Sequence, residues 1–127
     1  MYPRPRTYVQ STYHKAGTLL IRALSKNRII RTVGGRMAEE LVYDISDNFY
    51  SIRDRNQAFT LAVDYVLQNG GEVNRIVESA ENACLDILKE NRTSLDIIAR
   101  KLINGRILSD DEVVQIINSQ IDWDWET

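Results

Sequence analysis

Apolar residues recur at intervals of three and four along most of the chain, which is the spacing of one face of an α-helix. The clearest series runs from Val73 to Leu88, and similar series predict helices over residues 8–25 and 93–104. No stretch alternates apolar and polar residues over a useful length, as a half-buried strand would. The pattern therefore predicts an all-α fold, a compact bundle of about six helices joined by short turns.

Capping residues and glycines mark the ends of several predicted helices. Ser51-Ile52-Arg53-Asp54 has the form of a capping box at the start of a long helix, which Gly70-Gly71 ends. Ser109-Asp110-Asp111-Glu112 is a second capping box, opening a helix over residues 110–118. We expect this last helix to pack antiparallel against the preceding one, because only a short turn at Gly105 separates the two.

The pattern is less regular between the first two long helices. The apolar run at residues 29–33 predicts an extended segment or a buried loop. Gly34-Gly35 predicts a break, after which residues 37–42 form a short helix. Residues 44–50 are predicted to be a loop.

Composition narrows the class of protein. The chain has 127 residues, enough for one domain with its own core, and we assign residues 8–121 to a single helical domain. Residues 1–7 form an irregular basic arm, and residues 122–127 an acidic, aromatic tail. The net charge, 16 − 18 = −2, gives no electrostatic case for nucleic acid, which needs a basic face or stripe. One cysteine excludes an internal disulfide, and no apolar run is long enough to span a bilayer, so we expect a cytoplasmic protein.

Residues 34–41 read Gly-Gly-Arg-Met-Ala-Glu-Glu-Leu. Glu90-Asn91-Arg92 precede a Leu-x-x-Ile-Ala-x-x-Leu series at residues 95–102, and Asp54 marks a further segment at the start of a long helix. These three segments resemble the peptidase domain of the FtsH family, the membrane-anchored AAA zinc metalloproteases. The first matches the Gly-Gly-Arg-x-Ala-Glu-Glu-Leu signature of the family at every fixed position, and the second is similar to its final helices. The resemblance covers roughly residues 8 to 118. The family's domains assemble as rings of six, so the resemblance implies oligomerisation.

The chemistry of this family depends on an H-E-x-x-H helix, in which two histidines bind zinc and the glutamate polarises a metal-bound water. The matching segment here is His14-Lys15-Ala16-Gly17-Thr18. His14 matches the first ligand, but Lys15 replaces the glutamate and Thr18 replaces the second histidine. Asp54, four residues before Ala58, matches the aspartate that is the family's third zinc ligand.

These replacements disfavour catalysis. Lys15 is cationic at neutral pH, has no lone pair to accept a proton, and would repel a divalent cation. A threonine hydroxyl is not an ordinary zinc ligand, so His14 and Asp54 leave two protein ligands, one fewer than a catalytic site needs. We therefore expect no catalytic, cofactor-binding or metal-binding residues, and interpret His14, Lys15, Thr18 and Asp54 as vestigial site positions.

Other parts of the family's machinery are also missing from the sequence. Only 34 − 14 = 20 positions separate His14 from Gly34, where the family carries several dozen residues, including strands that help to form the substrate cleft. The chain has no G-x-x-x-x-G-K-[ST] loop, so we expect no ATP. It also lacks a membrane anchor, so we expect no membrane partner.

Simpler roles compete with the functional ones. A lone histidine such as His14 is more often a polar residue than a ligand, and Asp54 stands where a carboxylate caps a helix. Gly34-Gly35 favours a close backbone contact or a turn over an anion site, because Glu39-Glu40 follow at once. Cys84 lies in an apolar series and is expected in the core.

The two ends of the chain leave alternatives open. Arg4 and Arg6 are a weak footprint for nucleic acid, and a solvated arm is favoured. Trp123 and Trp125 form either a docking tail or a disordered end. If the chain self-associates, we expect these indoles to be buried against a neighbour, with the acids between them near the neighbour's basic arm.

The reading that best combines these observations is a non-catalytic FtsH-peptidase-like protein that acts through self-assembly or protein–protein interaction. One alternative is a zinc metallopeptidase with an unusual or residual active site, for which zinc would be the cofactor. A second alternative is a plain helical adaptor. A protein partner or a second copy is expected, and nucleic acid, membrane and ATP are not.

Overall fold

The computed structural model consists of α-helices throughout its described residues, whose backbone covers 7–44 and 52–126 and whose side chains cover 7–44 and 55–120. The helices are α1 (Tyr8–Leu24), α2 (Arg28–Tyr43), α3 (Ile52–Asn69), α4 (Val73–Glu90), α5 (Arg92–Ile103) and α6 (Asp110–Glu126). No strand occurs in these ranges. The predicted all-α bundle of about six helices is confirmed.

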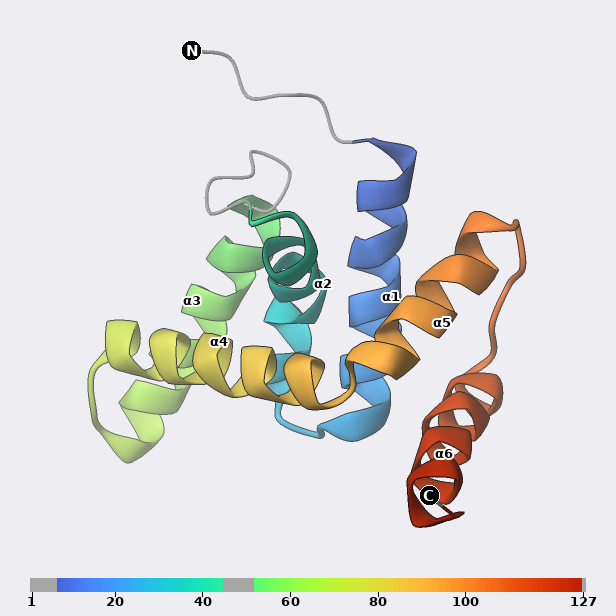
Figure 1. Cartoon of the computed structure of the whole chain (residues 1–127). Helices are drawn as coiled ribbons and strands as arrows, with labels where there is room; N and C mark the ends of the chain where they lie inside the picture. Colours follow the sequence, from blue (N-terminus) through green and yellow to red (C-terminus); the bar gives the residue numbers. More distant parts are fainter. Residues whose placement is uncertain (1–6, 45–51, 127) are drawn as a thin grey trace.

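The helices α1 and α2 form the centre of the bundle. They make the most extensive contact in the molecule and run in opposite directions (Figure 1). The helix α3 packs against α2, and α4 crosses α2 and α3. The helix α5 packs against α1, and α6 contacts both α5 and α1. The largest fully buried apolar side chains come from α1, α2, α4, α5 and α6, and are Leu20, Ile21, Val33, Met37, Val77, Cys84, Leu88, Leu95, Ile98 and Val113.

The expected break at Gly34-Gly35 is wrong, because α2 runs without interruption from Arg28 to Tyr43. The helix begins early because the Asn27 side chain accepts hydrogen bonds from the backbone N–H groups of Ile29 and Ile30. The apolar run at residues 29–33 is therefore the first turns of a helix, neither an extended segment nor a loop. Two glycines cost a helix about 1 kcal/mol each relative to alanine, so packing has to offset that cost.

The second capping box forms as predicted. The Glu112 N–H donates to Ser109 Oγ at 3.2 Å, and the Ser109 N–H donates to Glu112 Oε1 at 3.3 Å. The helix that it opens runs to Glu126, beyond the expected end at residue 118. The first box and the loop expected before it, apart from Asp44, lie outside the residues whose side chains are described.

The helices α5 and α6 are joined by a short connection, residues 104–109, in which Gly105 adopts a φ of 83°. Figure 1 shows α6 returning downward from this connection, opposite to the upward course of α5. The Arg22 guanidinium of α1 lies 2.6 Å from the Asp110 carboxylate, which ties the start of α6 to the end of α1. None of the helices in the described ranges is long and apolar enough to cross a membrane.

Candidate functional site

Small residues let α1 and α2 cross at very short distance. A Cβ atom added to Gly17 would lie 2.4 Å from the Cβ of Ala38 and 2.7 Å from the carbonyl oxygen of Gly34. A Cβ atom added to Gly34 would lie 2.9 Å from the Cβ of Ile21. Real Cβ atoms do not come this close to other atoms, so the crossing requires glycine at both positions. Residues 14–18, which match the position of the H-E-x-x-H motif, therefore contact the glycine-rich motif at residues 34–41 directly.

The His14 ring packs on the same crossing. A Cβ atom added to Gly35 would lie 2.6 Å from Cε1 of this ring, so the imidazole fills the space that the glycine leaves open. His14 Nε2 lies 3.9 Å from Oε1 of Glu39, whose side chain is only 1% exposed. The Gln10 amide donates to Glu39 Oε2 at 3.2 Å, which helps to offset the burial of this carboxylate.

The rest of the glycine-rich motif links α2 to α4. The buried Arg36 guanidinium pairs with Glu81 of α4 and lies 3.5 Å from Glu40, one turn along α2. Burial raises the pKa of Glu40 above its usual range, and the positive charge of Arg36 acts in the opposite direction. Together with the buried Met37 and Ala38, every motif position from Gly34 to Glu40 has a packing or pairing role.

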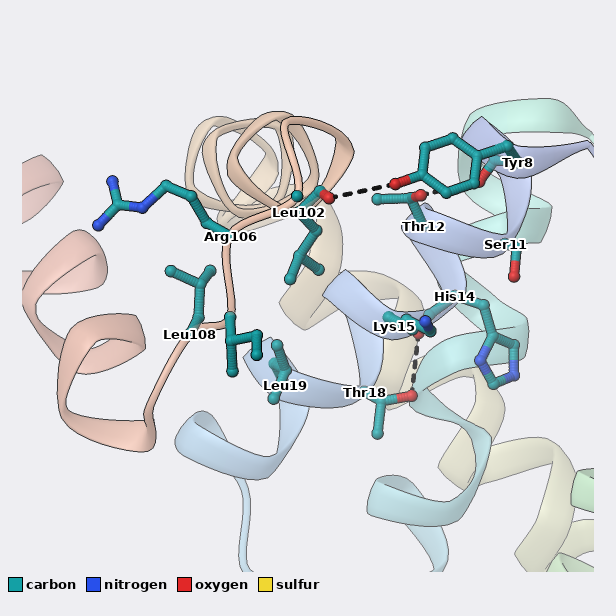
Figure 2. A pocket seen from close by; sticks show the side chains of 12 residues that line it. Tyr8, Ser11, Thr12, His14, Lys15, Thr18, Leu19, Leu102, Arg106 and Leu108 are labelled. Carbon is teal, nitrogen blue, oxygen red and sulfur yellow. Dashed lines mark hydrogen bonds between the residues drawn. The ribbon is translucent and has the colours of Figure 1, made fainter.

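Lys15 and Thr18, the other two positions on α1 that the sequence predicts to be vestigial, are exposed or bond to their own helix. Lys15 is exposed, and no ion pair of Lys15 occurs among the described residues. The Thr18 hydroxyl donates to the His14 carbonyl oxygen at 2.9 Å, one turn earlier (Figure 2). Asp54 is in the first turn of α3, a helix that packs on α2 and α4, but its side chain is outside the described residues. The described residues contain no group of three His, Cys, Asp or Glu side chains that could hold a metal ion.

A groove of about 660 Å³ runs between α1 and the α5–α6 connection. His14, Lys15 and Thr18 line it from α1, and Figure 2 shows Leu108 on the opposite wall. Next to Leu108, Ile107 is 93% exposed, the highest value among the exposed large apolar residues of the described part. The remaining lining residues are Tyr8, Ser11, Thr12, Leu19, Leu102, Gly105 and Arg106. Helical periodicity does not predict this groove, although two adjacent apolar residues in a short connection, Ile107 and Leu108, are a signal for it.

Two tyrosines hold α1 against α5 beside the groove. Tyr13 donates from its hydroxyl to Asp96 Oδ1 at 2.7 Å, and Tyr8 donates to the carbonyl oxygen of Ile103 at 3.4 Å. Burial, followed by the hydrogen bond to Asp96, raises the pKa of Tyr13 to about 12. The wall of the groove is therefore anchored at two points along α1.

Cys84 has no reactive character. Its side chain is 0% exposed in α4, as its position in the apolar series predicts, and burial raises the pKa of its thiol to about 12. A thiol that stays protonated at neutral pH is a poor nucleophile and a poor metal ligand. Arg4, Arg6 and the side chains of Trp123 and Trp125 lie outside the described residues.

No protein-family model, curated protein or solved structure matches the chain.

Proposed function

We propose that this chain is a non-catalytic relative of the FtsH peptidase domain that acts through self-assembly or protein–protein interaction. The observation that carries the proposal is the segment His14-Lys15-Ala16-Gly17-Thr18, which occupies the H-E-x-x-H position without its glutamate or its second histidine. The contacts of the two replacement residues support it. Thr18 uses its hydroxyl to bond the helix backbone, and Lys15 presents a cation where the family has its general base.

The nearest described carboxylate does not replace the missing glutamate. Glu39 faces His14 but is almost fully buried in the α1–α2 crossing and accepts a hydrogen bond from Gln10. A general base has to reach a metal-bound water, and the Glu39 carboxylate, which is only 1% exposed, is too deeply buried in the crossing to do so. These contacts favour a structural role for both His14 and Glu39.

Retention of the peptidase-like motifs is explained by packing. Gly17, Gly34 and Gly35 permit the close crossing, and Arg36 links α2 to α4. These contacts stabilise the helix bundle whether or not a metal binds beside it. The bundle is suited to contact with another protein chain because it presents an open groove and the exposed apolar side chain of Ile107.

Two measurements on the full chain test this proposal. Light scattering over a range of concentrations should give a mass above the 14.6 kDa of one chain. Incubation with an unfolded protein substrate, with and without added zinc, should show no more hydrolysis than the His14→Ala variant shows. Zinc-dependent hydrolysis that His14→Ala abolishes would support the metallopeptidase instead. A monomer without hydrolysis would support the plain helical adaptor.

A further inference from the structure

We infer that the groove between α1 and the α5–α6 connection binds residues 122–126 of a second copy of this chain. The inference rests on the proposed function and gives its self-assembly a specific contact. Three observations lead to it: the charge of the groove lining, the apolar surface left uncovered beside it, and the distance between the groove and its own chain's end.

The lining of the groove is cationic. Lys15 and Arg106 are its fully charged residues at neutral pH, and none of its lining residues is an aspartate or a glutamate. Lys15 has no ion pair among the described residues, and Arg106 has only an exposed contact of 3.5 Å with Glu112. Such an exposed pair contributes little, so Arg106 can exchange it for another carboxylate. Figure 2 shows Lys15 on α1 and the Arg106 side chain extending from the connection with its guanidinium directed away from α1, so that Arg106 has to turn toward the groove when it exchanges its partner.

The same groove has an apolar wall. Leu19, Leu102 and Leu108 line it together with Ile107, which is almost completely exposed. An exposed side chain of this size beside a cavity is typical of a binding surface, because covering it removes apolar area from water. The occupant must therefore combine carboxylates with large apolar side chains.

The C-terminal segment has this composition. Residues 122–126 read Asp-Trp-Asp-Trp-Glu, which places three carboxylates and two indoles within five positions and includes no cation. Tryptophan is the residue type most enriched at the energetic centres of interfaces, together with tyrosine and arginine. The other end of the chain carries Arg4 and Arg6 and no carboxylate in residues 1–7, so its charge is wrong for this groove.

The segment that binds must come from another copy. The helix α6 starts two residues after Leu108, beside the groove, and its 17 residues extend for about 25 Å. Figure 1 shows α6 descending from the connection, with the C-terminus at its far end. Within one copy, the groove therefore lies beside the start of α6 and the acidic segment lies at the other end of this helix. Contacts of this head-to-tail type generate closed rings or open chains.

Charge reversal in the full chain tests this contact by light scattering. The groove variant is Lys15→Glu with Arg106→Glu, and the segment variant is Asp122→Lys, Asp124→Lys and Glu126→Lys. Each alone should weaken self-association by about tenfold or more, because like charges then face one another. An equimolar mixture of the two should associate again, because each groove then meets a segment of opposite charge. A third variant, deletion of residues 122–127, should also lose the assembly.

A matched control is Lys26→Glu with Lys89→Glu, which makes the same change in net charge at exposed positions outside the groove. It should keep the parent's mass, and circular dichroism should show that all variants remain helical. An unchanged mass in the groove or segment variant, or a parent that is monomeric throughout, overturns the inference. Loss of association in the groove variant alone also overturns it, since another surface then fills the groove. Zinc-dependent hydrolysis that His14→Ala abolishes would overturn the proposed function without deciding this contact, whereas a self-associating parent whose groove variant keeps its mass would overturn this contact alone.

Discussion

At the scale of single residues, the absence of a Cβ atom at Gly17 and Gly34 determines how closely α1 and α2 can approach one another. Each lies where the backbone of one central helix touches the other, and an added Cβ would overlap Ala38 or Ile21. Glycine in a helix interior is otherwise unfavourable, because it has more conformational freedom to lose on folding. The close crossing therefore offsets a local cost with contacts that no larger residue permits.

Gly17→Ala tests this balance. Alanine is better than glycine in a helix by about 1 kcal/mol, but the clash with Ala38 and with the Gly34 carbonyl forces the helices apart. We expect a net loss of about 1–3 kcal/mol in the free energy of unfolding, measured by urea denaturation. Ser79→Ala on the exposed side of α4 is the control and should change it by less than about 0.5 kcal/mol. A more stable Gly17→Ala variant would show that the crossing is loose.

Tyr13 supplies a second prediction at the residue scale. Tyr13→Phe removes the hydrogen bond to Asp96, and we expect it to lower the free energy of unfolding by about 1–2 kcal/mol at pH 7. The pKa of Tyr13 is raised from 10.0 to about 12 in the folded chain, so folding favours the neutral phenol. The stabilisation is therefore complete below pH 10 and is lost as the pH rises through about 12.

Denaturation of the parent and the Tyr13→Phe variant from pH 7 to pH 11.5 measures this difference. The two curves should converge as the pH rises above 10. In the folded parent, absorbance at alkaline pH should also show a phenol with a pKa of about 12 that is missing from the Tyr13→Phe variant. A difference between parent and variant that grows above pH 10 would mean that the phenolate is the favoured form.

At the scale of elements, local signals predicted much of the secondary structure. The first helix was expected over 8–25 and is Tyr8–Leu24, and the capping box at Ser109 forms with both of its hydrogen bonds. The predicted helix break at Gly34-Gly35 is wrong. A glycine pair favours a break when the sequence is considered alone, and only the packing of a neighbouring helix shows that the pair lies inside a helix. The contact that keeps α2 straight comes from Gly17 and Ile21, and local pattern does not reveal it.

The relation between His14 and Thr18 can be tested by rebuilding the motif. Lys15→Glu with Thr18→His restores H-E-x-x-H, and both imidazoles would lie on one side of α1, because Figure 2 shows His14 and Thr18 one turn apart there. We expect zinc affinity to rise by about tenfold or more, measured by calorimetry. Asp54→Ala in this background should weaken the binding. We expect no strong proteolysis, because a loose site loses most of its rate.

A matched control tests whether zinc binding requires the spacing of the motif or only its residue types. Lys15→Glu with Ala23→His introduces the same residue types, but nine positions from His14, more than two turns along α1. This variant should bind zinc no better than the parent. A folded Lys15→Glu, Thr18→His variant that also shows no gain would mean that His14-Lys15-Ala16-Gly17-Thr18 is not the remnant of a metal site.

At the scale of the whole molecule, the main feature is the groove between α1 and the α5–α6 connection, which forms only when two distant segments of the chain come together. Its walls come from residues 8–19 and 102–108, which lie more than eighty positions apart in the sequence. Helical periodicity predicts that both segments exist but not that they face one another. A motif in the sequence predicts the vestigial positions, whereas the surface next to them, with exposed Ile107, is visible only in the folded chain.

The proposed function predicts that His14 binds no zinc in this chain. Elemental analysis of the purified full chain, prepared without added zinc, measures this most directly. Because Lys15 repels a divalent cation and Thr18 supplies no ordinary ligand, we predict zinc far below one ion per chain, unchanged by His14→Ala. Close to one zinc per chain, lost on His14→Ala, would contradict the account.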